Sequence, residues 1–131
     1  MEEIKSNLEE NGYVDTLFNR RIYINDSNAK NQRLRGFAER QAINAPIQGS
    51  AADIIKLAMV KIHKNLFEYK NDVSLLMQVH DELVFEIREN SVDKYSKIIQ
   101  EIMEHANLPK VSLNVKLKVD TGFGYNWAEA H

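Results

Sequence analysis

The chain has 131 residues, of which 44% are hydrophobic and 27% are charged, and its formal net charge at pH 7 is −2. This length suffices for one hydrophobic core and is short for two, so we expect a single domain over residues 1–131. The absence of cysteine excludes a disulfide scaffold and a thiolate metal site. No run approaches the roughly 18 apolar residues of a membrane span, so we expect a cytoplasmic protein without membrane contact.

The beginning of the chain predicts the end of a helix followed by a small hairpin. Residues 2–10 are polar with apolar side chains at helical spacing, and residues 11–12 (Asn-Gly) are a typical helix terminator. Residues 13–17 and 21–24 are short β-prone runs separated by a turn, which indicates a hairpin. The composition of residues 25–28 then predicts a loop.

A long helical pattern runs from residue 32 to about residue 67 and is interrupted by Pro46 and Gly49. An interior proline removes a backbone hydrogen bond and clashes with the preceding turn, so the pattern predicts either one kinked helix or two helices. Ser50 and Asp53 are available as caps for the second limb.

Residues 74–88 predict a second hairpin. Apolar and polar side chains alternate on both sides of His80 and Asp81, so each side is typical of a strand. Asp is a common turn residue because its side chain can bond nearby backbone amides. His80 and Asp81 are therefore expected at or near the turn.

The last elements predicted are a helix and a strand. Residues 91–107 have the pattern of an amphipathic helix, and residues 111–119 alternate strictly between apolar and polar side chains. A strand with one buried face suits an antiparallel sheet. We therefore expect an α+β fold in which the 74–88 hairpin and the 111–119 strand form one antiparallel sheet, backed by the long helix and the second helix.

The 80–82 segment is the main candidate for chemistry. His80, Asp81 and Glu82 bring titratable groups and hard oxygen ligands to one strand end, as a Mg²⁺ site requires. The alternatives are structural: Asp81 could simply bond the turn, and a histidine beside a hairpin is more often a hydrogen-bonded structural residue than a catalyst.

Three polar residues recur every four positions on the long helix, namely Arg40, Asn44 and Gln48. On a continuous helix they share one face. All three can donate hydrogen bonds to the minor-groove acceptors of DNA, which are nearly the same in every base pair. The alternative is that Asn44 and Gln48 satisfy backbone groups freed by Pro46.

Arginines gather in the first third of the chain, although the net charge is negative. They are Arg20, Arg21, Arg33, Arg35 and Arg40. Because a guanidinium forks onto phosphate oxygens, this clustering indicates a phosphate-facing surface, and the alternative is a solvated loop and helix face.

Two long motifs in this chain closely resemble the C-terminal part of the bacterial DNA polymerase I family, the family A polymerases. They are residues 40–54 (Arg-Gln-Ala-Ile-Asn-Ala-Pro-Ile-Gln-Gly-Ser-Ala-Ala-Asp-Ile) and residues 77–86 (Met-Gln-Val-His-Asp-Glu-Leu-Val-Phe-Glu), the second being similar to motif C of that family. Residues 12–17, 20–21 and 126–131 are similar to the family in the right order. The resemblance implies a palm-type sheet, with residues 1–31 on the fingers side and residues 32–131 in the palm.

The resemblance also implies roles for individual residues. Asp81 matches the motif C aspartate that ligates catalytic Mg²⁺, and Glu82 matches the neighbouring carboxylate with a supporting role. His80 is similar to a histidine near the primer terminus, and the residues of the 40–48 series match positions that contact DNA. The implied partners are primer-template DNA and deoxynucleoside triphosphates.

One part of the family pattern is missing from these 131 residues. No segment resembles motif A, which carries the other metal-binding aspartate, so we expect a polymerase fragment that is inactive by itself. Two alternatives remain open: a nucleic-acid-binding module without chemistry, and a small metal-dependent nuclease, which would need more carboxylates around Asp81 than the sequence offers.

Overall fold

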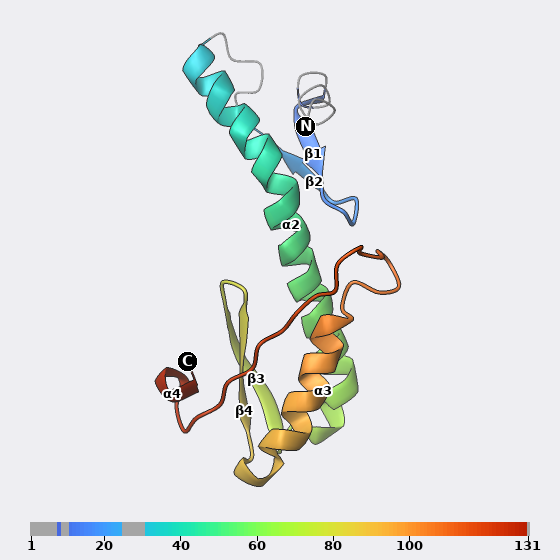
Figure 1. Ribbon diagram of the computed structural model, residues 1–131, viewed down its shortest axis with the longest axis vertical. Coiled ribbons are helices and arrows are strands. Elements are labelled where there is room, and N and C mark those ends of the chain that lie inside the picture. The colour runs from blue at the N-terminus through green and yellow to red at the C-terminus, as the bar shows by residue number, and fades with distance from the viewer. Residues whose placement is uncertain (1–7, 9–10, 25–30, 131) are drawn as a thin grey trace. The chain divides into compact units, whose positions relative to one another are not determined.

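The computed structural model describes residue 8 and residues 11–24 and 31–130 (Figure 1). The chain divides into two compact units, Met1–Asp53 and Ile54–His131, and we describe each by itself. The expected features of residues 2–7, 9–10 and 25–28 lie outside the described residues. No helix in the described part of the chain has the length and apolar character needed to cross a membrane.

The first unit begins with a helix end and a hairpin, as the sequence predicts. Asn11 is helical, and Gly12 has φ 74° and donates its amide to the Leu8 carbonyl at 2.8 Å, which is how glycine commonly ends a helix. Strands β1 (Tyr13–Asp15) and β2 (Arg21–Tyr23) then pair antiparallel. The predicted hairpin is confirmed.

Helix α2 (Gln32–Leu66) continues through Pro46 without a break in its helical assignment, so the chain forms one long helix and not two. It starts after Asn31, whose side-chain oxygen accepts the Arg33 amide at 2.9 Å. The core of the first unit lies between this helix and the hairpin, and consists of Leu8, Val14, Ile24, Ala38 and Ala42.

The second unit contains the larger hairpin. Strands β3 (Val73–Val79) and β4 (Glu82–Ile87) pair antiparallel from Val73 and Ile87 to Val79 and Glu82, with an irregularity in register between Leu75 and Met77. The predicted hairpin of residues 74–88 is therefore confirmed.

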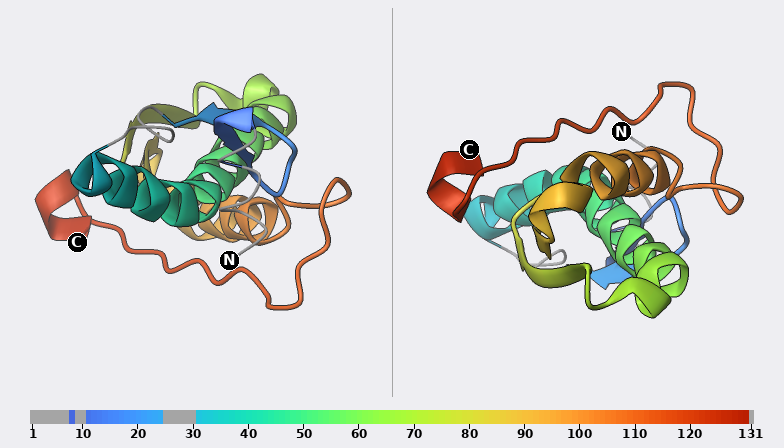
Figure 2. Two further views of the ribbon diagram at one scale, coloured as in Figure 1. Left: turned by 90° about the horizontal axis from the view of Figure 1, so that it is seen from above. Right: turned by 90° about the horizontal axis from the view of Figure 1, so that it is seen from below.

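Helix α3 (Val92–Glu104) confirms the predicted amphipathic helix, and Ser91 holds the position before it. Figure 2 shows α3 alongside the C-terminal part of α2. Short 3₁₀ turns join these elements at Phe67–Tyr69 (η1) and Glu89–Ser91 (η2), and a last helical turn, α4, covers Trp127–Ala130. The core of this unit consists of Ile62, Leu66, Val73, Tyr95 and Ile99.

The predicted strand at residues 111–119 is wrong. Each sheet in the described part of the chain has two strands, β1 with β2 and β3 with β4, and residues 111–119 pair with neither. Their alternation still appears in part as burial, because Val111 and Leu113 are half-buried whereas Val115 is 77% exposed. Alternation indicates which face of the chain is buried. A strand also needs a neighbouring strand that bonds its backbone amides and carbonyls.

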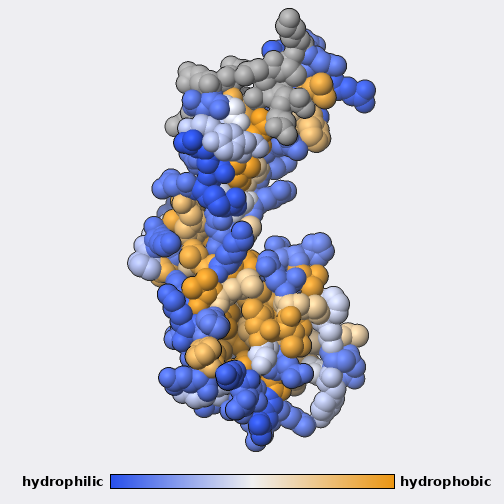
Figure 3. All heavy atoms as spheres, turned by 180° about the vertical axis from the view of Figure 1, so that it is seen from behind, coloured by the Kyte–Doolittle hydropathy of each residue, from blue (hydrophilic) through white to orange (hydrophobic). Residues whose placement is uncertain are grey.

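Apolar side chains also remain uncovered on the second unit, and Figure 3 shows several gathered on one face of it. On strand β3, Leu76 is 58% exposed, and Leu75 and Met77 are 37% and 38% exposed.

The α+β class is confirmed, and the antiparallel sheet of this unit is the two-stranded hairpin alone.

Candidate functional site

The β3–β4 turn consists of His80 and Asp81, because Val79 and Glu82 form the last pair of the ladder. His80 has φ 53°, a left-handed conformation that two-residue hairpin turns require and that glycine or asparagine usually supplies. For another residue this conformation costs about 1 kcal/mol or more. The strained histidine marks the turn as a candidate functional position.

Asp81 and Glu82 are both exposed at this turn. Neither a hydrogen bond nor an ion pair joins the Asp81 carboxylate to another residue that the structure describes, so its oxygens are available to a ligand. Glu82 is the first residue of β4, and adjacent strand residues point to opposite faces. The two carboxylates are therefore unequal candidates for one ligand.

The donor set fits Mg²⁺ in part. A carboxylate is the hard oxygen ligand that Mg²⁺ prefers, and Asp81 presents one to solvent. Mg²⁺ needs about six oxygens, however, and the described residues contain no group of three or more His, Asp or Glu side chains placed to hold a metal ion. Asp81 can supply one ligand of a site that other groups complete.

Arg40, Asn44 and Gln48 all lie on α2 and are all exposed. Their spacing of four places them on one face of the helix, and we call these three residues the donor ladder. Within the described part of the chain, no hydrogen bond engages the Asn44 or Gln48 side chain. The described residues therefore give no support to the alternative that these two side chains bond the backbone near Pro46.

The clustered arginines have different surroundings. Arg20 lies on the β1–β2 hairpin, where its Nε is 2.7 Å from Asp53 Oδ1 and its Nη2 donates to the Gly49 carbonyl at 3.4 Å. Arg33 and Arg35 are exposed in the first turn of α2. Arg20 is therefore engaged within the protein, whereas no side-chain partner of Arg33 or Arg35 is found among the residues that the structure describes.

Arg21 is exposed beside two tyrosines. Its guanidinium carbon lies 3.8 Å from the centre of the Tyr13 ring, and its Nη1 donates to the Tyr23 hydroxyl at 3.4 Å. The hydrogen bond to Tyr23 is the main cause that raises the pKa of Arg21 above its usual value. Arginine is charged at neutral pH in any case, and the guanidinium of Arg21 contacts both the Tyr13 ring and the Tyr23 hydroxyl.

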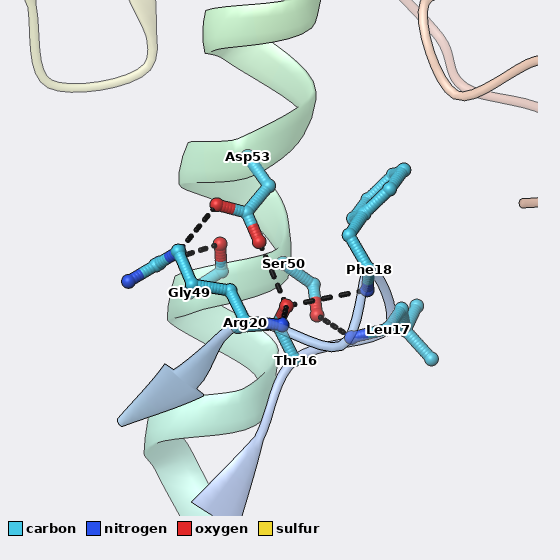
Figure 4. Close-up of polar contacts among 7 residues, drawn as sticks. All are labelled: Thr16, Leu17, Phe18, Arg20, Gly49, Ser50 and Asp53. Atoms are coloured by element: carbon cyan, nitrogen blue, oxygen red, sulfur yellow. Dashed lines mark hydrogen bonds and ion pairs between the residues drawn. The ribbon is translucent and has the colours of Figure 1, made fainter. Parts of the chain in front are cut away.

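Sequence reasoning missed a buried polar cluster between the first hairpin and α2, shown in Figure 4. Thr16 Oγ1 donates to Asp53 Oδ2 at 2.8 Å, and Ser50 Oγ accepts the Leu17 amide at 2.9 Å. The expectation that Ser50 and Asp53 cap a second helix is therefore wrong. Because α2 is continuous, no helix begins there, and both side chains bond the hairpin instead.

Comparison with known proteins identifies the class. Residues 1–129 match the family described as DNA polymerase family A. The chain is 46% identical over 133 residues to DNA polymerase I of Rhizobium leguminosarum and 45% identical over 130 residues to that of Bacillus subtilis. These matches cover 100% and 99% of the chain but 13% and 14% of the relatives' own lengths.

A solved structure agrees with these matches. It is the POL domain of Pol1 from M. smegmatis in complex with DNA primer-template and dNTP, to which the chain is 37% identical with a TM-score of 0.87. The match covers 98% of this chain and 22% of that structure. The chain therefore belongs to DNA polymerase family A.

Proposed function

We propose that this chain is the part of a DNA-directed DNA polymerase that supplies a metal-binding carboxylate and contacts to the primer-template. The polymerase transfers deoxynucleotides to a primer 3′ end in replication and repair. The observation that carries this proposal is the exposed carboxylate of Asp81 at the strained His80-Asp81 turn, in a chain that belongs to family A. We also propose that residues 1–31 lie on the fingers side and residues 32–131 in the palm, within a single domain.

Asp81 is the metal ligand in this proposal, and Glu82 supports it. When bound, Mg²⁺ stabilises the charge that develops on phosphoryl oxygens during nucleotide transfer. The carboxylate of Asp81 would occupy one coordination position of the ion, and the short turn fixes the place of its backbone. His80, at the same turn, is proposed to lie near the primer terminus.

The donor ladder is proposed to contact DNA in the minor groove. Guanidinium and amide groups donate to purine N3 and pyrimidine O2, which are present in every base pair. Arg21, Arg33 and Arg35 are proposed as phosphate contacts because their charges are exposed. Arg20 joins them as a weaker candidate, since Asp53 already engages its Nε.

The proposed partners are primer-template DNA and deoxynucleoside triphosphates. The structural relative's title names both as its own ligands, which supports the same partners here. We propose the cytoplasm as the compartment and no membrane partner.

A chimeric polymerase tests the proposed function. This chain would replace the 130 matching residues of the Bacillus subtilis relative, with which it shares 45% identity. We expect the chimera to extend a primer in a template-directed manner with Mg²⁺, because the chain provides the carboxylate and DNA contacts that the exchange removes. A chimera that folds and binds primer-template but adds no nucleotide would contradict the proposal.

The exposed donor ladder would also suit a nucleic-acid-binding module without chemistry, which is the second candidate function. The described residues favour it in one respect, since they assemble no cluster of three acidic or histidine side chains. The chimera distinguishes the two, because a binding module restores DNA affinity without nucleotide transfer.

Replacing ladder residues should weaken DNA binding without changing sequence preference. In the chimera we expect Arg40→Ala and Gln48→Ala each to lower primer-template affinity about tenfold, which corresponds to a lost hydrogen bond worth about 1.4 kcal/mol. The loss should be similar for every terminal base pair, because minor-groove acceptors barely differ between pairs. Fluorescence anisotropy with four primer-templates would measure it.

Gln32→Ala is the matched control for this prediction. Gln32 is also an exposed amide on α2, but at about 100° per residue it lies roughly 120° around the helix from the centre of the ladder. An equal loss from Gln32→Ala, or a loss confined to one base pair, would contradict the proposed contacts.

A further inference from the structure

The tip of the first hairpin is bonded to α2 after Pro46. Asp53 accepts from Thr16 Oγ1 at 2.8 Å and pairs with Arg20 Nε at 2.7 Å, and its side chain is only 10% exposed (Figure 4). One turn earlier, Ser50 accepts the Leu17 amide. Hydrogen bonds that are buried and involve a charge are among the stronger ones, so this attachment resists displacement.

The contact at Gly49 is unusually close. A Cβ at this position would lie 2.7 Å from Ile22 Cδ1 and 2.8 Å from Thr16 Cγ2, so side chains of the hairpin lie directly against the helix backbone. Any larger side chain would push the two elements apart.

The strands of the same hairpin are packed on α2 before Pro46. Val14 and Ile24 form one core cluster with Ala38 and Ala42. The hairpin thus contacts the helix on both sides of the proline, through apolar packing before it and polar bonds after it.

A proline weakens a helix at the point where it stands. Pro46 has no amide to bond the Ala42 carbonyl, and its ring crowds the preceding turn, so helices tend to bend there. The donor ladder crosses this point, since Arg40 and Asn44 precede Pro46 and Gln48 follows it. Any bend would move Gln48 out of line with the other two.

The ladder and the hairpin occupy different faces of α2. Ala42, Gly49 and Asp53 are buried, whereas the ladder residues are exposed. At about 100° per residue the two sets are centred roughly 160° apart on the helix. The hairpin can therefore brace the helix without covering the ladder.

We propose that the β1–β2 hairpin acts as a splint across Pro46, and that Asp53 is a positioning residue that keeps Gln48 aligned with Arg40 and Asn44 for DNA contact. This inference rests on the proposed function of the ladder. It assigns Asp53 no contact with DNA.

A double-mutant cycle in the chimera tests the splint. Asp53→Asn should lower primer-template affinity about fivefold, as expected for coupled residues. In that background, Gln48→Ala should cost less than about twofold instead of about tenfold, because Gln48 is already misplaced. A purely structural Asp53 would lower the melting temperature and leave the effect of Gln48→Ala unchanged.

Two further variants sharpen the test. Asp72→Asn is the matched control, since Asp72 also pairs with an arginine Nε, that of Arg88 at 3.0 Å, but on the second unit. It should leave DNA affinity unchanged. In a Pro46→Ala background, Asp53→Asn should cost less than about twofold, because a helix without the proline does not need the splint.

The outcomes separate the inference from the proposed function. Additive effects of Asp53→Asn and Gln48→Ala would overturn the splint while leaving the ladder in place. If Gln48→Ala alone had no effect on DNA affinity, both the ladder and the splint would be overturned. Thr16→Val removes the bond to Asp53 and also the acceptor of the Phe18 and Arg20 amides, and it replaces Asp53→Asn if that variant does not fold, with the same criteria.

Discussion

Asp81→Ala in the chimera should lower the rate of nucleotide transfer by roughly three orders of magnitude or more. The reason is that loss of a ligand to the catalytic cation removes several kcal/mol of transition-state stabilisation, and each 1.4 kcal/mol or so is a factor of ten. Primer-template affinity should change little, because the donor ladder and the exposed arginines remain. Single-turnover extension together with equilibrium DNA binding would measure both quantities.

Two neighbouring carboxylates serve as comparisons for Asp81. Glu82→Ala should cost about 10 to 100-fold, as is typical of groups that support a metal ligand. Glu86→Ala should cost nothing measurable, since Glu86 is an exposed residue farther along β4. The assignment is wrong if Glu82→Ala is the more damaging change, or if Asp81→Ala mainly weakens DNA binding.

The 131-residue chain by itself should show no primer extension. Nucleotide transfer by two cations needs carboxylates from at least two strands, and the described residues offer the adjacent pair Asp81 and Glu82 on one hairpin. Weak, salt-sensitive DNA binding should persist through Arg40 and the exposed arginines. Extension assays at micromolar protein, run beside the active chimera, would measure the difference.

Contamination by a host polymerase is the main hazard of that assay. The chain carrying Asp81→Ala, purified in parallel, is therefore the matched control. Extension by the unmodified chain that Asp81→Ala abolishes would show that the 131 residues are sufficient for activity.

The hairpin of residues 74–88 and the helix after it could be predicted from the sequence because their signals are local. Alternation on both sides of His80 and Asp81 fixes the strands and the turn, and the period of α3 places Tyr95 and Ile99 in the core. Such patterns depend on which side of one element is buried, and that can be judged without knowing its neighbours.

The errors concern relations between distant residues. Alternation in residues 111–119 is real, yet no rule of spacing says whether a partner strand is present. The position of Ser50 and Asp53 shortly after Pro46 predicts that they cap a helix, whereas their partners Thr16 and Leu17 are more than thirty positions away in sequence. The small residue Gly49 beside them was the one available signal of a close approach.

The candidate site was predictable in position but not in conformation. The sequence places His80 and Asp81 at the turn, and the structure adds that His80 has a positive φ and that Asp81 is exposed. The shared face of Arg40, Asn44 and Gln48 follows from spacing alone, provided that the helix is continuous through Pro46. The roles of these residues in catalysis and DNA contact remain predictions.

The unpaired segment at residues 111–119 affects how the chain behaves at high concentration. Residues 112–118 pair with no strand in the described part of the chain, and backbone left unpaired in this way is a template for intermolecular β-pairing and aggregation. The exposed apolar side chains of β3 add to that tendency. Lys116 and Lys118 oppose it, because two like charges on the solvent side of the segment repel an identical copy in register. Neutralising these two lysines would therefore lower solubility and favour self-association.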